Sequence, residues 1–238
     1  QVLRLTDNQA GTSWLVTKNT LAADCYWEFW IRLAFTPSSS NHPRIYLISD
    51  NHDLGAPLKG YYLQIGKDGT DNKRVFLYRQ TGDEHRALLA GASNLAAASN
   101  NQIRIRITRD LKGNWTLGAD PSGGRWFVPQ GSVYDNEHTY TGWFGLLCRY
   151  TISNANRFYF DDVDVGRLMP DTIPPRITQI LVNSPNSLEV FFDKAIDEES
   201  GNNPGNYLLA PGETLPRIAT VQQATPHWLH LIFYAVIL

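Results

Sequence analysis

Four side chains at every second position near the N-terminus offer the chemistry of sugar recognition. They are Tyr26, Glu28, Trp30 and Arg32. Aromatic rings stack on the apolar face of a sugar, while carboxylate and guanidinium groups form directional hydrogen bonds with its hydroxyls. A neutral sugar offers no net charge, so a site for one needs both kinds of contact. The spacing therefore indicates one face of a strand that could hold a glycan.

The same stretch, CYWEFWIRLAF over residues 25–35, carries a second set of side chains between these four. Successive side chains of a strand point to opposite faces, so an apolar set at period two predicts a buried face. The apolar set consists of Trp27, Phe29, Ile31, Leu33 and Phe35. We therefore expect one strand whose first face is core and whose second face carries the candidate groups.

Later alternating segments add similar side chains at positions outside the predicted core. The full set of candidate ligand-binding residues is Tyr26, Glu28, Trp30, Arg32, Tyr46, Tyr62, Tyr78, Arg104 and Arg106. In a second interpretation the aromatic rings fill space within the fold or under loops. Glu28 then pairs with Arg104 or Arg106 across neighbouring strands. The residues alone leave both interpretations open.

Catalysis is not indicated. A retaining glycosidase needs two carboxyl groups about 5 Å apart on one face, and Glu28 is alone on its predicted strand. Other carboxylates cluster at residues 135–137 and 197–199, in stretches typical of turns. No Gly-x-Ser-x-Gly motif occurs. The sequence predicts a non-catalytic protein, with a glycan-active hydrolase as the weaker alternative.

Alternating segments separated by turn-forming residues predict an all-β chain. An Ala-rich stretch at residues 86–101 is interrupted by Gly91, and we expect a loop there with at most one helical turn. Three prolines between residues 167 and 177 cannot lie inside a sheet ladder, so they predict a connector at 169–175. This divides the chain into a first domain, 1–168, and a second domain, 176–238.

The first domain resembles the concanavalin A-like jelly rolls, a class that includes laminin-G-like, lectin and glucanase domains. The resemblance is carried by the closing segment RFYFDDVDV and by the order YWEFWIRL, PRIYLISD, GYYLQIG, VFLYRQ, IRIRITRDLKGNW and GWFGLLCRYT. It implies a β-sandwich with a curved sheet whose concave side can present a groove. It also implies a structural calcium ion, for which Asp161 and Asp162 are the matching oxygens. A β-bulge explains the two aspartates equally well, and calcium needs six to eight oxygen ligands.

The second domain resembles the bacterial Ig-like modules of S-layer and other secreted proteins. The matching residues are DTIPPRITQILVNSPNSLEVFFDKAID and, after them, NNPGNYLL. Only about 60 residues follow the connector, fewer than the roughly 100 of an immunoglobulin-type domain, so we expect it to be truncated. The combination is similar to large multidomain surface proteins of Gram-negative bacteria. It implies an extracellular or outer-surface location, with neighbouring domains of the same polypeptide as partners.

The composition of the chain argues against nucleic acid as a partner and against a membrane span. A formal net charge of −2 gives no general attraction to nucleic acid, and no apolar segment long enough to span a membrane occurs. Cys25 and Cys148 both lie in predicted strands, so one disulfide and two buried free thiols are equally open. We therefore expect a non-catalytic binding or adhesion module with a polysaccharide or other glycan as ligand. A purely structural spacer is the alternative.

Overall fold

The computed structural model of the chain describes residues 2–67, 69, 73–169, 173–207, 218–225 and 228–233. The chain divides into two compact units, Gln1–Met169 and Pro170–Leu238. Residues 170–172 of the predicted connector lie outside the described residues. The described helices are short: α1 (Glu198–Gly201), η1 (Ile152–Asn154) and η2 (Pro204–Asn206). None of the helices in the described part of the chain could span a membrane.

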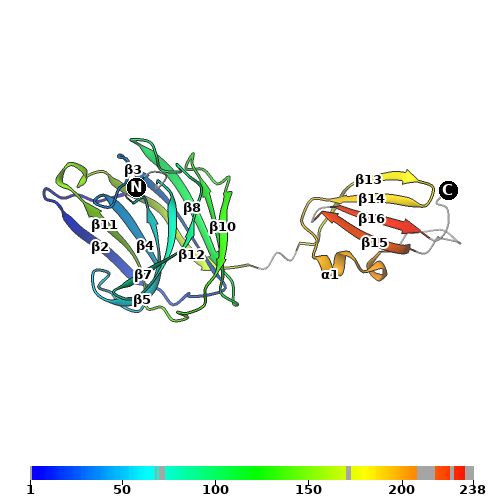
Figure 1. The fold of residues 1–238 in the computed structure, drawn as a ribbon, viewed down its shortest axis with the longest axis horizontal. Helices are drawn as coiled ribbons and strands as arrows, with labels where there is room; N and C mark the ends of the chain where they lie inside the picture. The colour runs from blue at the N-terminus through cyan, green and yellow to red at the C-terminus, as the bar shows by residue number, and fades with distance from the viewer. Residues whose placement is uncertain are drawn as a thin grey trace. The chain divides into compact units, whose positions relative to one another are not determined.

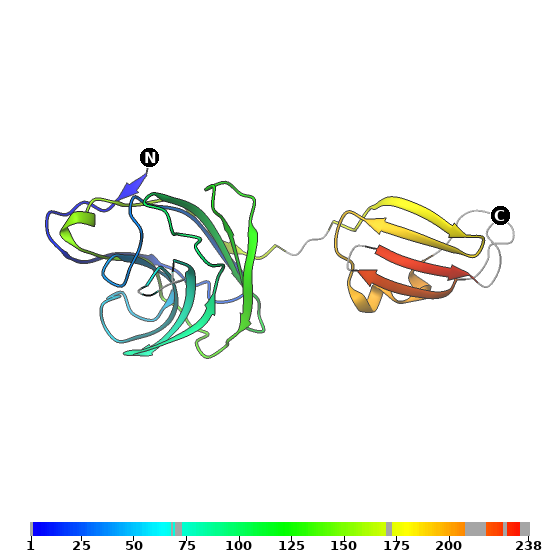
Figure 2. The same cartoon turned by 45° about the horizontal axis from the view of Figure 1, so that its top comes forward.

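Two antiparallel sheets form the first unit and face each other as the layers of a sandwich (Figures 1 and 2). Sheet A has the order β1 (Leu3–Arg4), β12 (Phe158–Arg167), β3 (Cys25–Leu33), β8 (Asn101–Arg109), β9 (Asn114–Asp120) and β10 (Val128–Tyr134). Sheet B has the order β2 (Gly11–Lys18), β11 (Trp143–Tyr150), β4 (His42–Ser49), β5 (Leu58–Ile65), β6 (Val75–Gly82) and β7 (Glu84–Ala90). The predicted all-β sandwich is confirmed.

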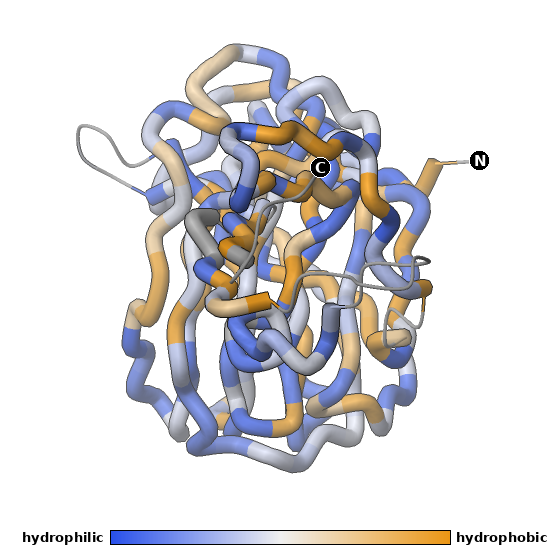
Figure 3. The backbone as a smooth tube through the Cα atoms, turned by 90° about the vertical axis from the view of Figure 1, so that its right-hand side faces the viewer, coloured by the Kyte–Doolittle hydropathy of each residue, from blue (hydrophilic) through white to orange (hydrophobic). Residues whose placement is uncertain are grey.

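The core lies between the inward faces of these sheets. Hydrophobic and hydrophilic residues alternate along the strands, as the colours in Figure 3 show. On β3 the predicted apolar face is buried: Trp27, Phe29, Ile31 and Leu33 are each 0% exposed. Trp27 stacks on Trp115 of β9 with ring centroids 5.7 Å apart. Each such side chain contributes about 1.5–3 kcal/mol to stability through its burial, so β3 is a central element of the fold.

Strand β7 corrects the prediction of a loop at residues 86–101, because residues 84–90 pair with β6 along the edge of sheet B. A tight turn at Gly82, with φ of +64°, joins the two strands. Leu88 and Leu89 also pack against the main core. Their Ala-rich surroundings carry no strand pattern, so the hairpin and its tertiary contacts decide this conformation.

The second unit contains one antiparallel sheet. Its order is β13 (Ile177–Ser184), β14 (Ser187–Phe192), β16 (Trp228–Phe233) and β15 (Ile218–Thr225). Leu188, Val190 and Leu231 form a small buried cluster. Of the strands predicted here, residues 208–210, 217, 227 and 234–238 lie outside the described residues.

Candidate functional site

The candidate ligand-binding residues do not share one surface. Those on β3 and β8 belong to sheet A, whereas Tyr46, Tyr62 and Tyr78 belong to β4, β5 and β6 of sheet B. Each sheet uses its inward face for the core, so the two outer faces point in opposite directions. Period-two alternation identifies the outer face of a strand but does not say which sheet the strand joins. The prediction of one groove formed by all nine residues is therefore replaced by two separate faces.

Glu28 lies at the centre of an ion-pair network on the outer face of sheet A. Its carboxylate is 3.5 Å from Arg104 Nη1, 3.4 Å from Arg106 Nη1 and 3.0 Å from Arg125 Nε. The residue is only 6% exposed. This is the cross-strand pairing of the second interpretation, since β3 and β8 are neighbours and Glu28 lies opposite Arg106.

The loop between β9 and β10, residues 121–127, covers this face. Arg125 donates to Glu28, and Arg104 Nε donates to the carbonyl oxygen of Gly123 at 3.2 Å. Gly123 has a φ of +79°, and a Cβ there would lie 2.7 Å from Nε1 of Trp30. The loop therefore needs glycine both for its backbone conformation and for its close approach. With its carboxylate held by three arginines beneath this loop, Glu28 serves the fold.

The other candidate positions on sheet A are also occupied by intramolecular contacts. The Tyr26 hydroxyl donates to the Asp164 carboxylate at 2.8 Å, and the guanidinium of Arg106 lies 4.5 Å from the centre of the Tyr26 ring. Arg32 Nε donates to Asn100 at 2.9 Å. Tyr26, Trp30 and Arg32 are half-buried, so none of them forms an open stacking platform.

Asp161 and Asp162 lie in a β-bulge of β12, where the pairing with β3 shifts between Asp161 and Asp164. Asp162 has a φ of +48°, and its carboxylate accepts from Arg104 Nη2 at 2.6 Å. This hydrogen bond holds the pKa of Asp162 below its usual value. Among the described residues no group of three or more His, Cys, Asp or Glu side chains converges as a metal site would require. The shift in pairing is the β-bulge of the second interpretation of Asp161 and Asp162, and calcium binding at these aspartates stays a prediction.

Cys25 and Cys148 are both free and buried, which is the second of the two alternatives that the sequence left open. Cys25 begins β3 in sheet A, whereas Cys148 lies on β11 in sheet B, so each thiol belongs to a different layer. Burial raises the pKa of Cys25 to about 12 and also raises the pKa of Cys148. Both thiols act as small apolar groups of the core.

Asp135, from the acidic stretch considered for catalysis, is likewise structural. Its carboxylate accepts from the hydroxyl of Tyr61 and pairs with Arg79 Nη1 at 2.6 Å. Its backbone oxygen accepts from Nε1 of Trp115 at 3.0 Å. Asp135 is 8% exposed, and residues of three different strands hold it inside the fold, two through its carboxylate and one through its backbone oxygen.

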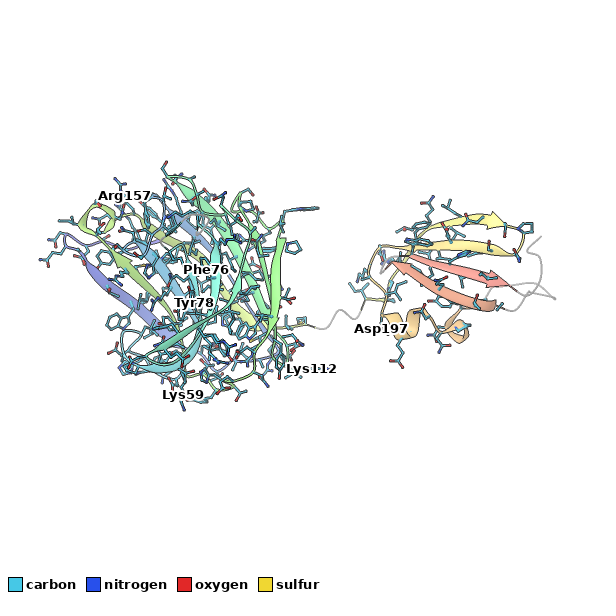
Figure 4. All side chains as sticks on the ribbon, viewed as in Figure 1. Lys59, Phe76, Tyr78, Lys112, Arg157 and Asp197 are labelled. Atoms are coloured by element: carbon cyan, nitrogen blue, oxygen red, sulfur yellow. The ribbon has the colours of Figure 1, made fainter. Side chains whose placement is uncertain are left out.

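Three tyrosines form a row across the outer face of sheet B. Tyr46 lies opposite Tyr62, and Tyr62 lies opposite Tyr78. The Tyr62 and Tyr78 rings are stacked with centroids 5.1 Å apart, and Phe76 and Tyr78 both project from β6 (Figure 4). Leu54 and Leu58, from the loop before β5 and its first residue, pack on this row and leave Tyr46 at 0% and Tyr62 at 1% exposure. Only Tyr78 remains partly open to solvent.

A cavity of about 200 Å³ opens beside this loop on the outer face of sheet B. The polar and charged side chains that line it include Thr12, His42, Arg44, Gln80, Asp83, His85 and Arg149. Arg149 lies opposite His42, and Leu147 lies opposite Arg44, so strands β4 and β11 place both guanidinium groups on one face. The sequence interpretation did not select His42, Arg44, His85 or Arg149. The spacing of His42, Arg44 and Tyr46 at alternate positions is a signal for the first two, whereas His85 and Arg149 come from other strands and carry no such signal.

The two histidines of this cavity are neutral at neutral pH. Burial, aided by the charge of Arg44, lowers the pKa of His42 to about 4 and lowers the pKa of His85 as well. His42 Nδ1 donates to the carbonyl oxygen of Ser38 at 3.1 Å, which leaves Nε2 as an acceptor. His85 Nδ1 shares a hydrogen bond with the Tyr62 hydroxyl at 3.0 Å. The cavity thus combines neutral imidazoles, an amide, two cations and the carboxylate of Asp83.

A second, larger cavity of about 550 Å³ lies along the open side of the sandwich. Its walls include Leu3, Leu15, Phe144, Leu146 and Val163. Few polar side chains reach into it, whereas a site that orients a sugar needs directional hydrogen bonds. The cavity on sheet B is therefore the better candidate for a sugar.

Comparison with known proteins shows the fold of the first unit. No protein-family model matches the sequence, and the curated proteins give no significant match. The chain is similar to the Ca²⁺/Man-bound exoplasmic/lumenal domain of VIP36, at 10% identity and a TM-score of 0.57, over 73% of this chain and 81% of that one. It is also similar to the carbohydrate recognition domain of Emp46p in its metal-free form, at 12% identity and a TM-score of 0.52, over 68% and 80%. At these identities the likeness establishes a lectin-like, concanavalin A-like jelly-roll β-sandwich.

Proposed function

We propose that the first unit is a non-catalytic carbohydrate-binding module and that the cavity on the outer face of sheet B is its binding site. The observation that carries this proposal is the convergence of Arg44, Arg149, His42, His85 and Gln80 on one open cavity. These side chains supply donors and acceptors that match sugar hydroxyls. The similarity of the fold to carbohydrate recognition domains supports the same assignment.

The size of the cavity favours a short or terminal sugar unit. Its volume of about 200 Å³ is below the roughly 300–1,000 Å³ of pockets for drug-sized ligands. Tyr46, Leu54 and Leu147 also line the cavity and supply apolar surface next to these polar groups. A single ring with its hydroxyls in the cavity, and the rest of the glycan in solvent, fits this arrangement.

The number and positions of the carboxylates support a non-catalytic role. Among the described residues that line the cavity, Asp83 is the single carboxylate, whereas glycoside hydrolysis needs two in defined positions. Glu28 and Asp135 are held by arginines elsewhere in the fold. The cavity can therefore bind a sugar through hydrogen bonds without a pair of groups to cleave it.

The second unit and the cellular context complete the proposal. We infer that residues 176–238 belong to an Ig-like module and that the chain is part of a secreted or surface-exposed bacterial protein. The sequence resemblance and the antiparallel sheet β13–β14–β16–β15 support this. A structural spacer is the second candidate, because Tyr46 and Tyr62 are covered instead of exposed.

A glycan array probed with the whole chain, with and without Ca²⁺, tests the binding function. Ala56 lines the cavity, so Ala56→Phe should fill it and weaken binding of any hit at least tenfold. Ala97→Phe, at an exposed loop position, is the matched control and should bind like the parent chain. Absence of binding to every glycan in both conditions would favour the spacer.

A further inference from the structure

We propose that the sugar bound in the sheet B cavity is acidic and that Arg44 and Arg149 bind its carboxylate. This inference rests on the function proposed above and names the class of glycan. Guanidinium groups match the planar geometry of a carboxylate, and such charge-assisted hydrogen bonds are roughly twice as strong as neutral ones.

The register of β4 and β11 places the two arginines as diagonal neighbours. Arg149 pairs with His42, two residues before Arg44, and Leu147 pairs with Arg44 itself. Diagonal positions in an antiparallel pair are about 7–8 Å apart, which long side chains span easily. Both residues line the same cavity. One anionic group can therefore contact both guanidinium groups.

Neither arginine has a carboxylate partner within the described part of the chain. Arg44 Nε donates to the Gln64 side chain at 3.0 Å, and its guanidinium lies 4.9 Å from the centre of the Tyr62 ring. Arg149 is exposed, and none of the ion pairs between described residues includes it. By contrast, each of the three arginines that surround Glu28 on the outer face of sheet A forms an ion pair with that carboxylate. The cavity keeps two cations that the fold does not use for ion pairing.

The charge balance of the cavity is positive although the chain is not. Two arginines face one aspartate, Asp83, in a chain with a formal net charge of −2. Burial raises the pKa of Tyr62 and Tyr78, and the positive charge of Arg44 opposes that rise. Because His42 and His85 are neutral, the arginines alone provide the positive potential at neutral pH. A neutral sugar would leave this potential unused, whereas an acidic sugar complements it.

Titration calorimetry of the whole chain with oligogalacturonate and with its fully methyl-esterified form distinguishes a site for an acidic sugar from a site for a neutral one. The two ligands share the same rings and differ in the charge of the carboxyl groups. We expect the acid to bind at least tenfold more tightly than the ester, and its affinity to fall between about 50 and roughly 300 mM NaCl as screening grows. A sulfated oligosaccharide forms the third arm, and preferential binding of sulfate would overturn the carboxylate assignment.

Substitutions of Arg149 and Arg44 test whether these two residues bind the carboxylate. Arg149→Gln removes an exposed cation and should reduce affinity for the acid at least tenfold, while Arg149→Lys should recover part of it. Arg44→Gln should act in the same direction, with its melting temperature measured to establish that it folds. Arg157→Gln is the control, because Arg157 does not line the cavity. Equal binding of acid and ester, or an Arg149→Gln chain that binds like Arg157→Gln, would overturn this inference and leave the carbohydrate-binding proposal standing. Absence of binding to every glycan, neutral and acidic, would overturn both this inference and the carbohydrate-binding proposal.

Discussion

Asp162 and Arg104 are joined by a hydrogen bond of 2.6 Å although their strands, β12 and β8, are not neighbours in sheet A. Strand β3 lies between them. The β-bulge and the φ of +48° at Asp162 direct its carboxylate across β3 towards the guanidinium. Asp162, one of the two aspartates that suggested a calcium site, therefore forms an internal ion pair.

This pair makes stability depend on pH in the acidic range. Hydrogen bonds lower the pKa of Asp162, and also of Asp7, Asp110 and Asp120, in the folded state. The unfolded chain therefore binds more protons below about pH 4, so the stabilisation is present at neutral pH and is lost as the pH falls through these lowered pKa values. Chemical denaturation between about pH 2 and about 7 should show this loss. Asp162→Asn should give a shallower dependence, and an identical dependence would contradict the role of the pair.

Glu28 should prove important for stability and unimportant for binding. Glu28→Ala leaves the buried guanidinium of Arg104 without one of its partners and should lower the free energy of unfolding by about 3 kcal/mol, the lower end of the range for buried pairs. Arg125 is mostly exposed, so Arg125→Ala should cost less than about 1 kcal/mol. Urea unfolding measures both.

Measurements of glycan binding by variants distinguish the outer face of sheet A from the outer face of sheet B as the binding site. If sheet B holds the ligand, Glu28→Gln and Trp30→Ala should retain the affinity of the parent chain for any glycan hit, provided that each variant remains folded. Loss of affinity in these variants, with the sheet B variant Arg149→Gln unaffected, would transfer the binding site to sheet A.

Gly123 should tolerate no side chain. In Gly123→Ala the left-handed backbone costs roughly 1 kcal/mol, and the contact with Trp30 at 2.7 Å adds a steric term, giving about 2–3 kcal/mol in total. Gly82→Ala is the matched control, since Gly82 also has a positive φ but a Cβ at this position would have no neighbour within 4 Å. It should cost only about 1 kcal/mol. An equal decrease in melting temperature for the two variants would mean that the 121–127 loop does not pack closely against sheet A.

The two cysteines should be unreactive in the folded chain and reactive after unfolding. Both are buried, and burial raises the pKa of each thiol, so little thiolate forms at neutral pH. A thiol-specific reagent should label neither cysteine under native conditions and both in denaturant without reductant. Failure to label in denaturant would indicate a disulfide between Cys25 and Cys148.

The local sequence pattern is sufficient to predict those features of the fold that depend on a single strand. The alternation of residues 25–35 predicts the buried face of β3, because period two separates core from solvent within any single strand. The succession of such strands predicts the sandwich, and their order carries the resemblance to concanavalin A-like jelly rolls. Strand β7 escapes prediction because its residues 84–90 take their conformation from the hairpin with β6 and not from their own propensities.

The candidate site depends on information that no local pattern contains. The sequence by itself determined which side chains lie outside the main core, including Glu28, Tyr46 and Tyr78. Only the tertiary structure decided that β3 joins sheet A beneath the 121–127 loop, whereas β4 pairs with β11 and brings Arg149 beside Arg44. These pairings join residues about a hundred positions apart, and they arise from the strand order of the sheets and not from the spacing along any one strand.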